Sequence, residues 1–343
     1  MSMYFSLSDT EIKYTTQGCE CGVRRDGRGL TDCRTLQLEN NILPHVNGSS
    51  RVLLSESMDV ICSIKMDIIE CLKDYPDKGV LMISADISPS CGIKIDEKKR
   101  VEMSSRVSER LQSILLGSSA INLNDLCIIS GKYCWILHID LIINQLDGDP
   151  LDVCSVAAYI ALQSTRIPKI DTIIGESGRP DDFQVCGDLA SSKTLQINHI
   201  PICITVVKIG NSFIMDATSA EHASADCAFT VAIDENGNIC GMFKLHGHTS
   251  LAIPELSQML EVRIYYYIYF ILTLSHLLCN GEFITNSFIF FHFLIYNLHV
   301  YILPYFFFYS IYYLGCVLYG RKYIRTFTQF NSQYSLQYCS QSS

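Results

Sequence analysis

The clearest pattern in the chain is an alternation of side chains between Tyr133 and Ile143. Every odd-numbered position from Trp135 to Ile143 is large and apolar, and Cys134, Ile136 and Ile142 add apolar side chains at even positions. A period of two with apolar residues on both faces predicts a strand that is buried on both sides.

A helix is predicted directly after this strand. Asp147-Gly148 favours a turn, Asp149 is suited to cap the helix, and Pro150 fits the first helical position because no backbone N–H is needed there. The positions that would face the sheet are small, and small residues let a helix pack closely against its neighbours. They are Cys154, Ala157, Ala158 and Ala161.

Shorter apolar stretches bounded by turn residues predict further strands on both sides of this unit. They are residues 36–38, 52–54, 60–64, 80–87, 200–209, 212–217, 227–233 and 238–245. Glu97–Leu116 carries one apolar stripe and is predicted as a helix, whereas the polar residues 171–192 are predicted as an exposed loop. Each half thus contains strands followed by a helix, which indicates the α+β class.

Charge is distributed unevenly along the 343 residues, whose formal net charge is −9. Residues 1–261 hold 34 acidic and 22 basic residues, whereas residues 262–343 hold one acidic and four basic residues. An acidic body excludes nucleic-acid binding over the whole surface, so any RNA contact must use a local basic patch. The first residues show no charged segment followed by an apolar one, so we expect no signal peptide.

The sixteen cysteines include no Cys-x-x-Cys pair and fall mostly at apolar strand and helix positions. This placement predicts small hydrophobic residues in a reducing compartment rather than disulfides. Cys19, Cys21 and Cys33 could be offered as zinc ligands, but no fourth ligand follows at a finger spacing. His246 and His248 are better explained as a polar turn. We therefore expect no metal and no cofactor.

The densest basic cluster of the body lies on the helix predicted over Glu97–Leu116. It comprises Lys98, Lys99, Arg100, Arg106 and Arg110. Arg106 and Arg110 are four residues apart and therefore share a helix face. The residues alone allow either an RNA contact or a solvated face with a Glu102–Arg106 pair.

Four stretches together resemble the RNase PH family. They are Arg25-Asp26-Gly27-Arg28 with Asp32 and Arg34, residues 47–52, the strand–helix unit of residues 133–168, and residues 200–210 with Asp216-Ala217-Thr218. They occur in the family's order and cover roughly residues 8–255. Ser55-Glu56-Ser57 replaces the family's usual Gly-x-Thr, which is a mild departure.

The resemblance implies an RNase PH-like α+β fold, a two-fold repeat of antiparallel and mixed sheets packed with helices. It places an N-terminal segment at 1–24 and the domain at 25–261, with halves of roughly 25–150 and 151–261. Within the family, the chain is most similar to non-catalytic ring subunits of the RNA exosome. Such subunits scaffold 3′–5′ RNA processing and degradation, ribosomal RNA maturation included, in the nucleus, nucleolus and cytoplasm.

The same resemblance implies partners and a role for basic residues. The expected partners are other RNase PH-like subunits in a six-membered ring, RNA-binding cap subunits, and RNA threaded through the pore. Archaeal relatives carry an Arg-x-x-x-Arg pair that touches RNA at the pore, and Arg106 and Arg110 match its spacing, with Lys99 and Arg100 nearby. The arginine-rich segment 24–34 corresponds to a structural signature, so we expect a solvated turn held by Asp–Arg pairs.

Catalysis by active relatives requires arginines that hold phosphate and a pair of carboxylates, usually as a metal site. The first acid of that pair falls at His222 and the second at or near Asp226. Asp149 stands in the turn where active members offer phosphate a backbone cradle, and Pro150 has no N–H to donate. We therefore expect no catalysis; the alternative is an active phosphate-dependent 3′–5′ exoribonuclease.

The composition changes abruptly at Val262, inside the expected final helix. Fourteen of the 19 Tyr and 11 of the 16 Phe lie beyond residue 261. Runs of about 20 apolar residues can span a membrane, so a membrane anchor is one alternative. We favour a retained intron, since AT-rich DNA encodes such residues in any frame, and expect an atypical apolar tail over 262–343 and no membrane association.

Overall fold

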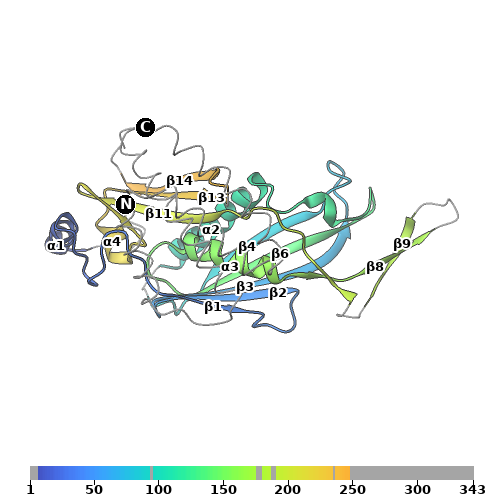
Figure 1. Cartoon of the computed structure of the whole chain (residues 1–343), viewed down its shortest axis with the longest axis horizontal. Coiled ribbons are helices and arrows are strands. Elements are labelled where there is room, and N and C mark those ends of the chain that lie inside the picture. Colours follow the sequence, from blue (N-terminus) through green and yellow to red (C-terminus); the bar gives the residue numbers. More distant parts are fainter. Residues whose placement is uncertain (1–6, 93–95, 175–179, 187–190, 235, 248–343) are drawn as a thin grey trace, which may run out of the picture. The chain divides into compact units, whose positions relative to one another are not determined.

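The computed structural model describes residues 7–92, 96–174, 180–186, 191–234 and 236–247. The larger sheet has the order β1-β2-β3-β6-β4, with β5 pairing to β6 as well (Figure 1). Its strands are β1 (Leu36–Asn40), β2 (Gly48–Leu54), β3 (Met58–Glu70), β4 (Val80–Ile87), β5 (Cys127–Ile129) and β6 (Tyr133–Gln145). The β4–β6 pair is parallel, and the other pairs of this sheet are antiparallel.

A second, smaller sheet is built from the strands predicted near the end of the body, and its order is β12-β11-β13-β14. They are β11 (Ile202–Ile209), β12 (Ser212–Met215), β13 (Cys227–Ile233) and β14 (Ile239–Gly247). Helix α2 (Glu97–Gly117) packs on β4 and β14, while helix α3 (Pro150–Ser164) packs on β2, β3 and β11. Two helices between two sheets make a mixed α+β fold, as expected.

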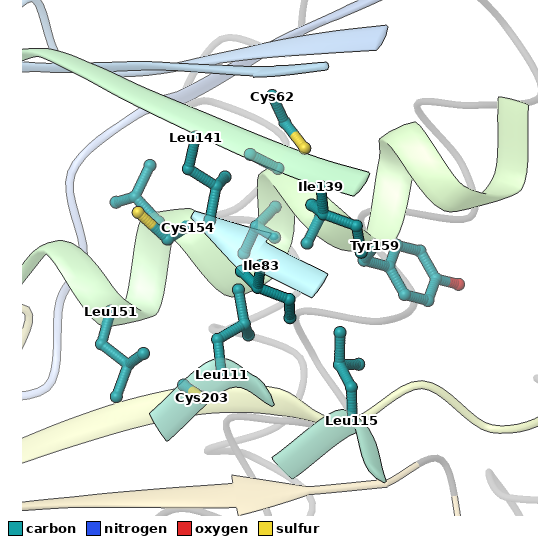
Figure 2. Close-up of a cluster of buried hydrophobic side chains, with 14 of the residues drawn as sticks. Cys62, Ile83, Leu111, Leu115, Ile139, Leu141, Leu151, Cys154, Tyr159 and Cys203 are labelled. Carbon is teal, nitrogen blue, oxygen red and sulfur yellow. The ribbon is translucent and has the colours of Figure 1, made fainter. Parts of the chain in front are cut away.

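The core lies where these helices meet the sheets. Figure 2 shows side chains from β3, β4 and β6 facing those of α2 and α3, with Cys203 contributed by β11. The small face predicted for α3 is buried throughout. The backbone of α3 approaches the sheet closely at Gly48 of β2, where an added Cβ would lie 2.6 Å from the Ala161 carbonyl oxygen.

Burial of β6 follows the predicted alternation on one face and only partly on the other. The odd-numbered apolar side chains join the core. On the even face Cys134 and Ile136 are buried, but Ile142 is 47% exposed. The expectation of a strand buried on both sides therefore holds for its first half only, because α2 and α3 cover one face.

The segment 171–192 is not the loop that its polar composition predicted. Strands β8 (Ile170–Ile174) and β9 (Pro180–Val185) pair antiparallel, and Phe183 of β9 packs edge-on against Tyr133, with ring centroids 5.1 Å apart. Beside them, β7 (Arg166–Ile167) pairs with β10 (Lys193–Thr194). A cross-strand ladder satisfies the backbone whatever the side chains are, so polarity alone was a poor guide.

Three short elements complete the described chain. Helix α1 (Asp9–Glu20) begins with a capping box between Ser8 and Glu11. Helix α4 (Ser219–Ala223) begins with a second capping box between Thr218 and Glu221, and the 3₁₀ turn η1 spans Leu123–Leu126. No helix of the described residues is long and apolar enough to cross a bilayer, and the predicted tail lies outside those residues.

Candidate functional site

A hollow of about 650 Å³ opens where several loops of the two halves converge. We call it the loop hollow. The turn after β2, the segment after β4, the end of β6 and the start of α4 all contribute to it. Its lining residues are Arg25, Asp26, Glu56, Ser57, Ser90, Cys91, Gly92, Gln145, Leu146, Asp147, Thr218, Ser219, Ala220 and Glu221.

Behind this hollow, Arg24 and Glu221 form a buried ion pair. Arg24 Nη2 donates to Glu221 Oε2 at 2.6 Å and Nε donates to Oε1 at 2.9 Å. The two side chains are 0% and 3% exposed. Burial alone would lower the pKa of Arg24, but the hydrogen bond and charge of Glu221 raise it, so the guanidinium stays charged.

A second cluster of opposite charges lies beside this pair and is centred on Asp216. Arg34 Nη2 donates to Asp216 Oδ1 at 2.5 Å and Arg34 Nη1 donates to Asp147 Oδ2 at 2.9 Å. Arg28 Nη1 donates to Asp216 Oδ2 at 2.8 Å, and Arg28 also pairs with Asp26. Burial acts to lower the pKa of Arg34, whereas Asp216 and Asp147 raise it.

These contacts correct the expectation of a solvated turn held by local Asp–Arg pairs. One such pair exists, between Arg28 and Asp26. Arg24 and Arg34, however, are buried or nearly so, and pair with carboxylates of the second half and of the loop after β6. Local spacing could not predict them, since 197 residues separate Arg24 from Glu221 and 182 separate Arg34 from Asp216.

His222, where the first catalytic acid was expected, lies on α4 and is 2% exposed. Its Nδ1 is 3.2 Å from Nε2 of His246 on β14, so one ring donates a hydrogen bond to the other. Burial, then His246 and Arg34, lower the pKa of His222 to about 3. The imidazole is therefore neutral at physiological pH. The two histidines grouped by sequence were His246 and His248, and His248 lies outside the described residues.

Asp226, the second expected acid, is exposed and points to a different partner. Its Oδ2 accepts a hydrogen bond of 2.8 Å from the backbone N–H of Gly210, in the turn between β11 and β12. His222 and Asp226 are thus directed to separate groups. No group of three His, Cys, Asp or Glu side chains in the described part of the chain is arranged to hold a metal ion.

Asp149 occupies the helix cap position that the sequence assigned to it, but its side chain lies in the interior. Oδ2 accepts hydrogen bonds from Thr205 Oγ1 at 3.0 Å and Thr230 Oγ1 at 3.3 Å. Burial raises the pKa of this carboxyl above its usual value. The carboxylate of this loop that lines the hollow is Asp147, which the sequence had marked only as a turn residue.

The basic residues of α2 have contacts within the protein. Arg106 pairs with Glu102, as the sequence allowed. Arg110 Nη2 donates to the Lys244 carbonyl oxygen at 3.4 Å, and its guanidinium carbon lies 5.5 Å from the Phe243 ring centroid. Both arginines are half-buried, as are Lys99 and Arg100 in the first turn of the helix.

Comparison with known proteins assigns the fold to a family. Residues 32–168 match the 3′ exoribonuclease family, domain 1 (RNase PH), and residues 199–264 match domain 2 of the same family. A protein named "Putative exosome complex exonuclease RRP42" from Dictyostelium discoideum is 29% identical, over 74% of this chain and 92% of its own length. "Exosome complex component Rrp42" from Thermococcus kodakarensis is 30% identical, over 64% of this chain and 77% of its own length.

Solved structures agree with the sequence matches. A chain described as "archaeoglobus fulgidus exosome with RNA bound to the active site" superposes with a TM-score of 0.65 and 26% identity, covering 75% of this chain and 94% of that one. A chain from an archaeal exosome core gives 0.62 at the same identity. The chain therefore belongs to the RNase PH family, and within it to the Rrp42 type.

Proposed function

We propose that the chain is a non-catalytic, RNase PH-like subunit of an RNA exosome ring. The proteins it resembles carry exosome-component names, and its fold matches chains of exosome cores. The single observation that carries the non-catalytic part is the state of the expected acid pair. One position is a buried neutral histidine, and the other is an aspartate directed at a backbone turn.

The loop hollow also offers little to an anionic substrate. Among the described residues that line it, Arg25 stands against the carboxylates of Asp26, Glu56, Asp147 and Glu221. Arg24 and Arg34 are not available to hold phosphate, because they form ion pairs with Glu221, Asp216 and Asp147. Carboxylates near a phosphate raise its free energy of binding, so this hollow disfavours phosphorolysis. Asp149 was expected to repel phosphate at this turn, but its side chain is buried, and Asp147 is the carboxylate that lines the hollow there.

We expect the chain to pair with a second RNase PH-like chain within a six-membered ring of such subunits, to which RNA-binding cap subunits also bind. A tagged copy purified from native extract should bring such subunits with it, identified by mass spectrometry. Ring subunits bury sheet edges and apolar faces in a neighbour, so we expect a stable heterodimer. A monodisperse monomer that does not co-elute with these partners in size-exclusion chromatography would contradict the ring assignment. Residence in nucleus, nucleolus and cytoplasm is part of the same proposal.

We expect no phosphorolysis from the reconstituted heterodimer. With 3′-labelled and 5′-labelled RNA, Mg²⁺, and phosphate added or withheld, neither a labelled nucleoside diphosphate from the 3′ end nor a shortened 5′-labelled RNA should accumulate, because even one lost electrostatic donor costs about 10²–10³ in rate. His222→Asp should also remain inactive, since Asp26, Glu56, Asp147 and Glu221 still outnumber Arg25 among the described residues that line the hollow. An active RNase PH protein serves as the positive control. Phosphate-dependent product that disappears in an Asp226→Asn variant would establish the enzyme alternative.

Arg106 and Arg110, with Lys99 and Arg100 beside them, are proposed to contact RNA in the assembled ring. Each lost phosphate contact should weaken binding for all sequences and flatten the salt dependence by about one unit of slope. The test is the Arg106→Glu, Arg110→Glu complex, compared with a Lys65→Glu complex that reverses an exposed charge on β3. If the two complexes have equal RNA affinity and equal salt dependence, the arginines do not contact RNA and belong to a solvated helix face.

A further inference from the structure

Three thiols lie together at one end of the larger sheet, and the loop hollow does not include them. Cys71 directly follows β3, Cys127 begins β5, and Cys134 is the second residue of β6. We call them the sheet-end thiols. They come from three separate strands, so their proximity is a property of the fold and not of local sequence.

Strand register sets the spacing of these residues. Cys127 and Cys134 are direct partners in the antiparallel β5–β6 pair. In a regular antiparallel pair, directly opposed Cα atoms lie about 4.5–5.5 Å apart, which falls within the range of about 4.4–6.8 Å that a disulfide requires. The β5–β6 pair is irregular between Cys127 and Ile129, but the two cysteines remain register partners, so a disulfide between them needs only a local adjustment.

Cys71 stands beside this pair on the same face of the sheet. Glu70 is the partner of Tyr133, and Cys71 N donates to the Lys132 carbonyl oxygen at 2.9 Å. Cys71 is therefore the diagonal neighbour of Cys134. Its thiol interacts with those of both Cys127 and Cys134, so the three sulfurs form a continuous chain of contacts.

Access distinguishes the sheet-end thiols from the other sulfur-rich part of the protein. Cys71 and Cys127 are half-buried and only Cys134 is fully buried. In the core, Cys62, Cys154 and Cys203 come from β3, α3 and β11, and all three are buried (Figure 2). A small solute can therefore reach Cys71 and Cys127 but none of the three core cysteines, which provides a control within the same molecule.

We propose that the sheet-end thiols are an oxidation site, at which a peroxide joins Cys127 to Cys134 in a disulfide and Cys71 serves as the exchange thiol. One thiolate attacks the O–O bond and becomes a sulfenic acid, and the hydroxide released takes up that thiol's proton to form water. The facing thiol then attacks the sulfenic sulfur, the S–O bond breaks, and a second water leaves. Two electrons pass from the two sulfurs to the peroxide, which is fully reduced to water.

Cys71 can redistribute this bond. Its thiolate can attack the Cys127–Cys134 disulfide, form a new bond to one sulfur and release the other as a thiolate. The site therefore keeps one reduced thiol in every oxidised form. Burial raises the pKa of Cys127, and burial followed by Cys71 raises that of Cys134 to about 11. Because the thiolate is the reactive form, we expect oxidation to accelerate as the pH rises, roughly tenfold per unit as long as the attacking thiol is mostly protonated.

The experiment uses the full chain, purified with a reductant that is then removed, and exposed to hydrogen peroxide at pH 7 and pH 8. Remaining thiols are blocked with N-ethylmaleimide before a non-reducing tryptic digest. Trypsin cuts after Lys132, so Cys127 and Cys134 fall on different peptides; Cys154 shares the 133–166 peptide with Cys134, and fragmentation of the linked peptides shows which of the two carries the bond. We expect this linked pair in oxidised protein and its loss on reduction. Cys62, Cys154 and Cys203 should stay reduced.

Variants show whether the site is specific. Cys127→Ser changes a half-buried residue and should move the link to Cys71 and Cys134, whereas Cys186→Ser, a half-buried cysteine beside Asp171, should leave the original link unchanged. The proposal is overturned if peroxide links none of the three thiols in folded protein. It is also overturned if core cysteines oxidise equally fast, or if the links form only in urea.

Discussion

Arg24→Met is expected to lower the free energy of unfolding by about 3–5 kcal/mol, because it leaves the buried Glu221 carboxylate without its counter-charge. The arginine also donates to the carbonyl oxygens of Asp32, Met215 and Asp216, which lose a donor at the same time. Urea unfolding followed by far-UV circular dichroism measures the change. Met is chosen because it keeps the length and apolar stem of the side chain.

Two further variants test the cause of this loss. Arg24→Met with Glu221→Met removes both charges and should be more stable than Arg24→Met alone, although it also loses the Glu221 capping contact with Thr218. Arg106→Met removes an arginine whose partner Glu102 is 58% exposed, so the carboxylate left behind stays hydrated and the change should cost no more than about 1 kcal/mol. Equal losses for Arg24→Met and Arg106→Met would show that burial of the ion pair has no special effect.

Gly148→Ala is expected to destabilise the protein by about 2–6 kcal/mol, through backbone strain and overpacking together. Gly148 has φ +102°, and an added Cβ would lie 2.4 Å from the Ala217 carbonyl oxygen. Backbone atoms cannot move aside as a flexible side chain would. The change would also disturb the hydrogen bond from Gly148 N to Ser219 Oγ, which joins the loop after β6 to the start of α4.

Gly131→Ala is the matched control for this prediction. Gly131 has φ +75° and no atom within 4 Å of an added Cβ, so it should show only the conformational strain of about 1–2 kcal/mol. Thermal or urea unfolding of the two variants isolates the effect of the close contact. Similar losses at both positions would mean that the loop moves freely away from residue 217.

Local pattern was sufficient for the elements that periodicity controls. The alternation before Ile143 and the start and small face of α3 each depend on neighbours within a few residues, and each lies where it was expected, although Asp149 makes no side-chain capping hydrogen bond. The β8–β9 ribbon was missed because the segment as a whole is rich in Gly, Asp and Ser, which obscured the three isoleucines of β8, and a ladder of backbone hydrogen bonds needs no apolar pattern. Pairing between distant strands cannot be read from either strand alone.

The candidate site was less accessible to sequence reasoning for the same reason. The positions of His222 and Asp226 followed from the resemblance, but their partners did not, since His246 and Gly210 lie on other elements. Asp149 and Asp147 are two residues apart, and only the fold decides that one turns inward and the other lines the hollow. Arg24 and Arg34 carry no local signal of the distant carboxylates that bind them.

The ion pairs between the arginine-rich segment and the second half also constrain how the chain can fold during synthesis. Arg24 emerges from the ribosome 197 residues before its partner Glu221. At about 5–20 residues per second, the segment waits roughly 10–40 s with its guanidinium groups hydrated or bound elsewhere. The larger sheet can form in that interval, since its strands all precede residue 146. The arginine-rich segment 24–34 is thus synthesised early and is among the last parts of the body to reach its final contacts.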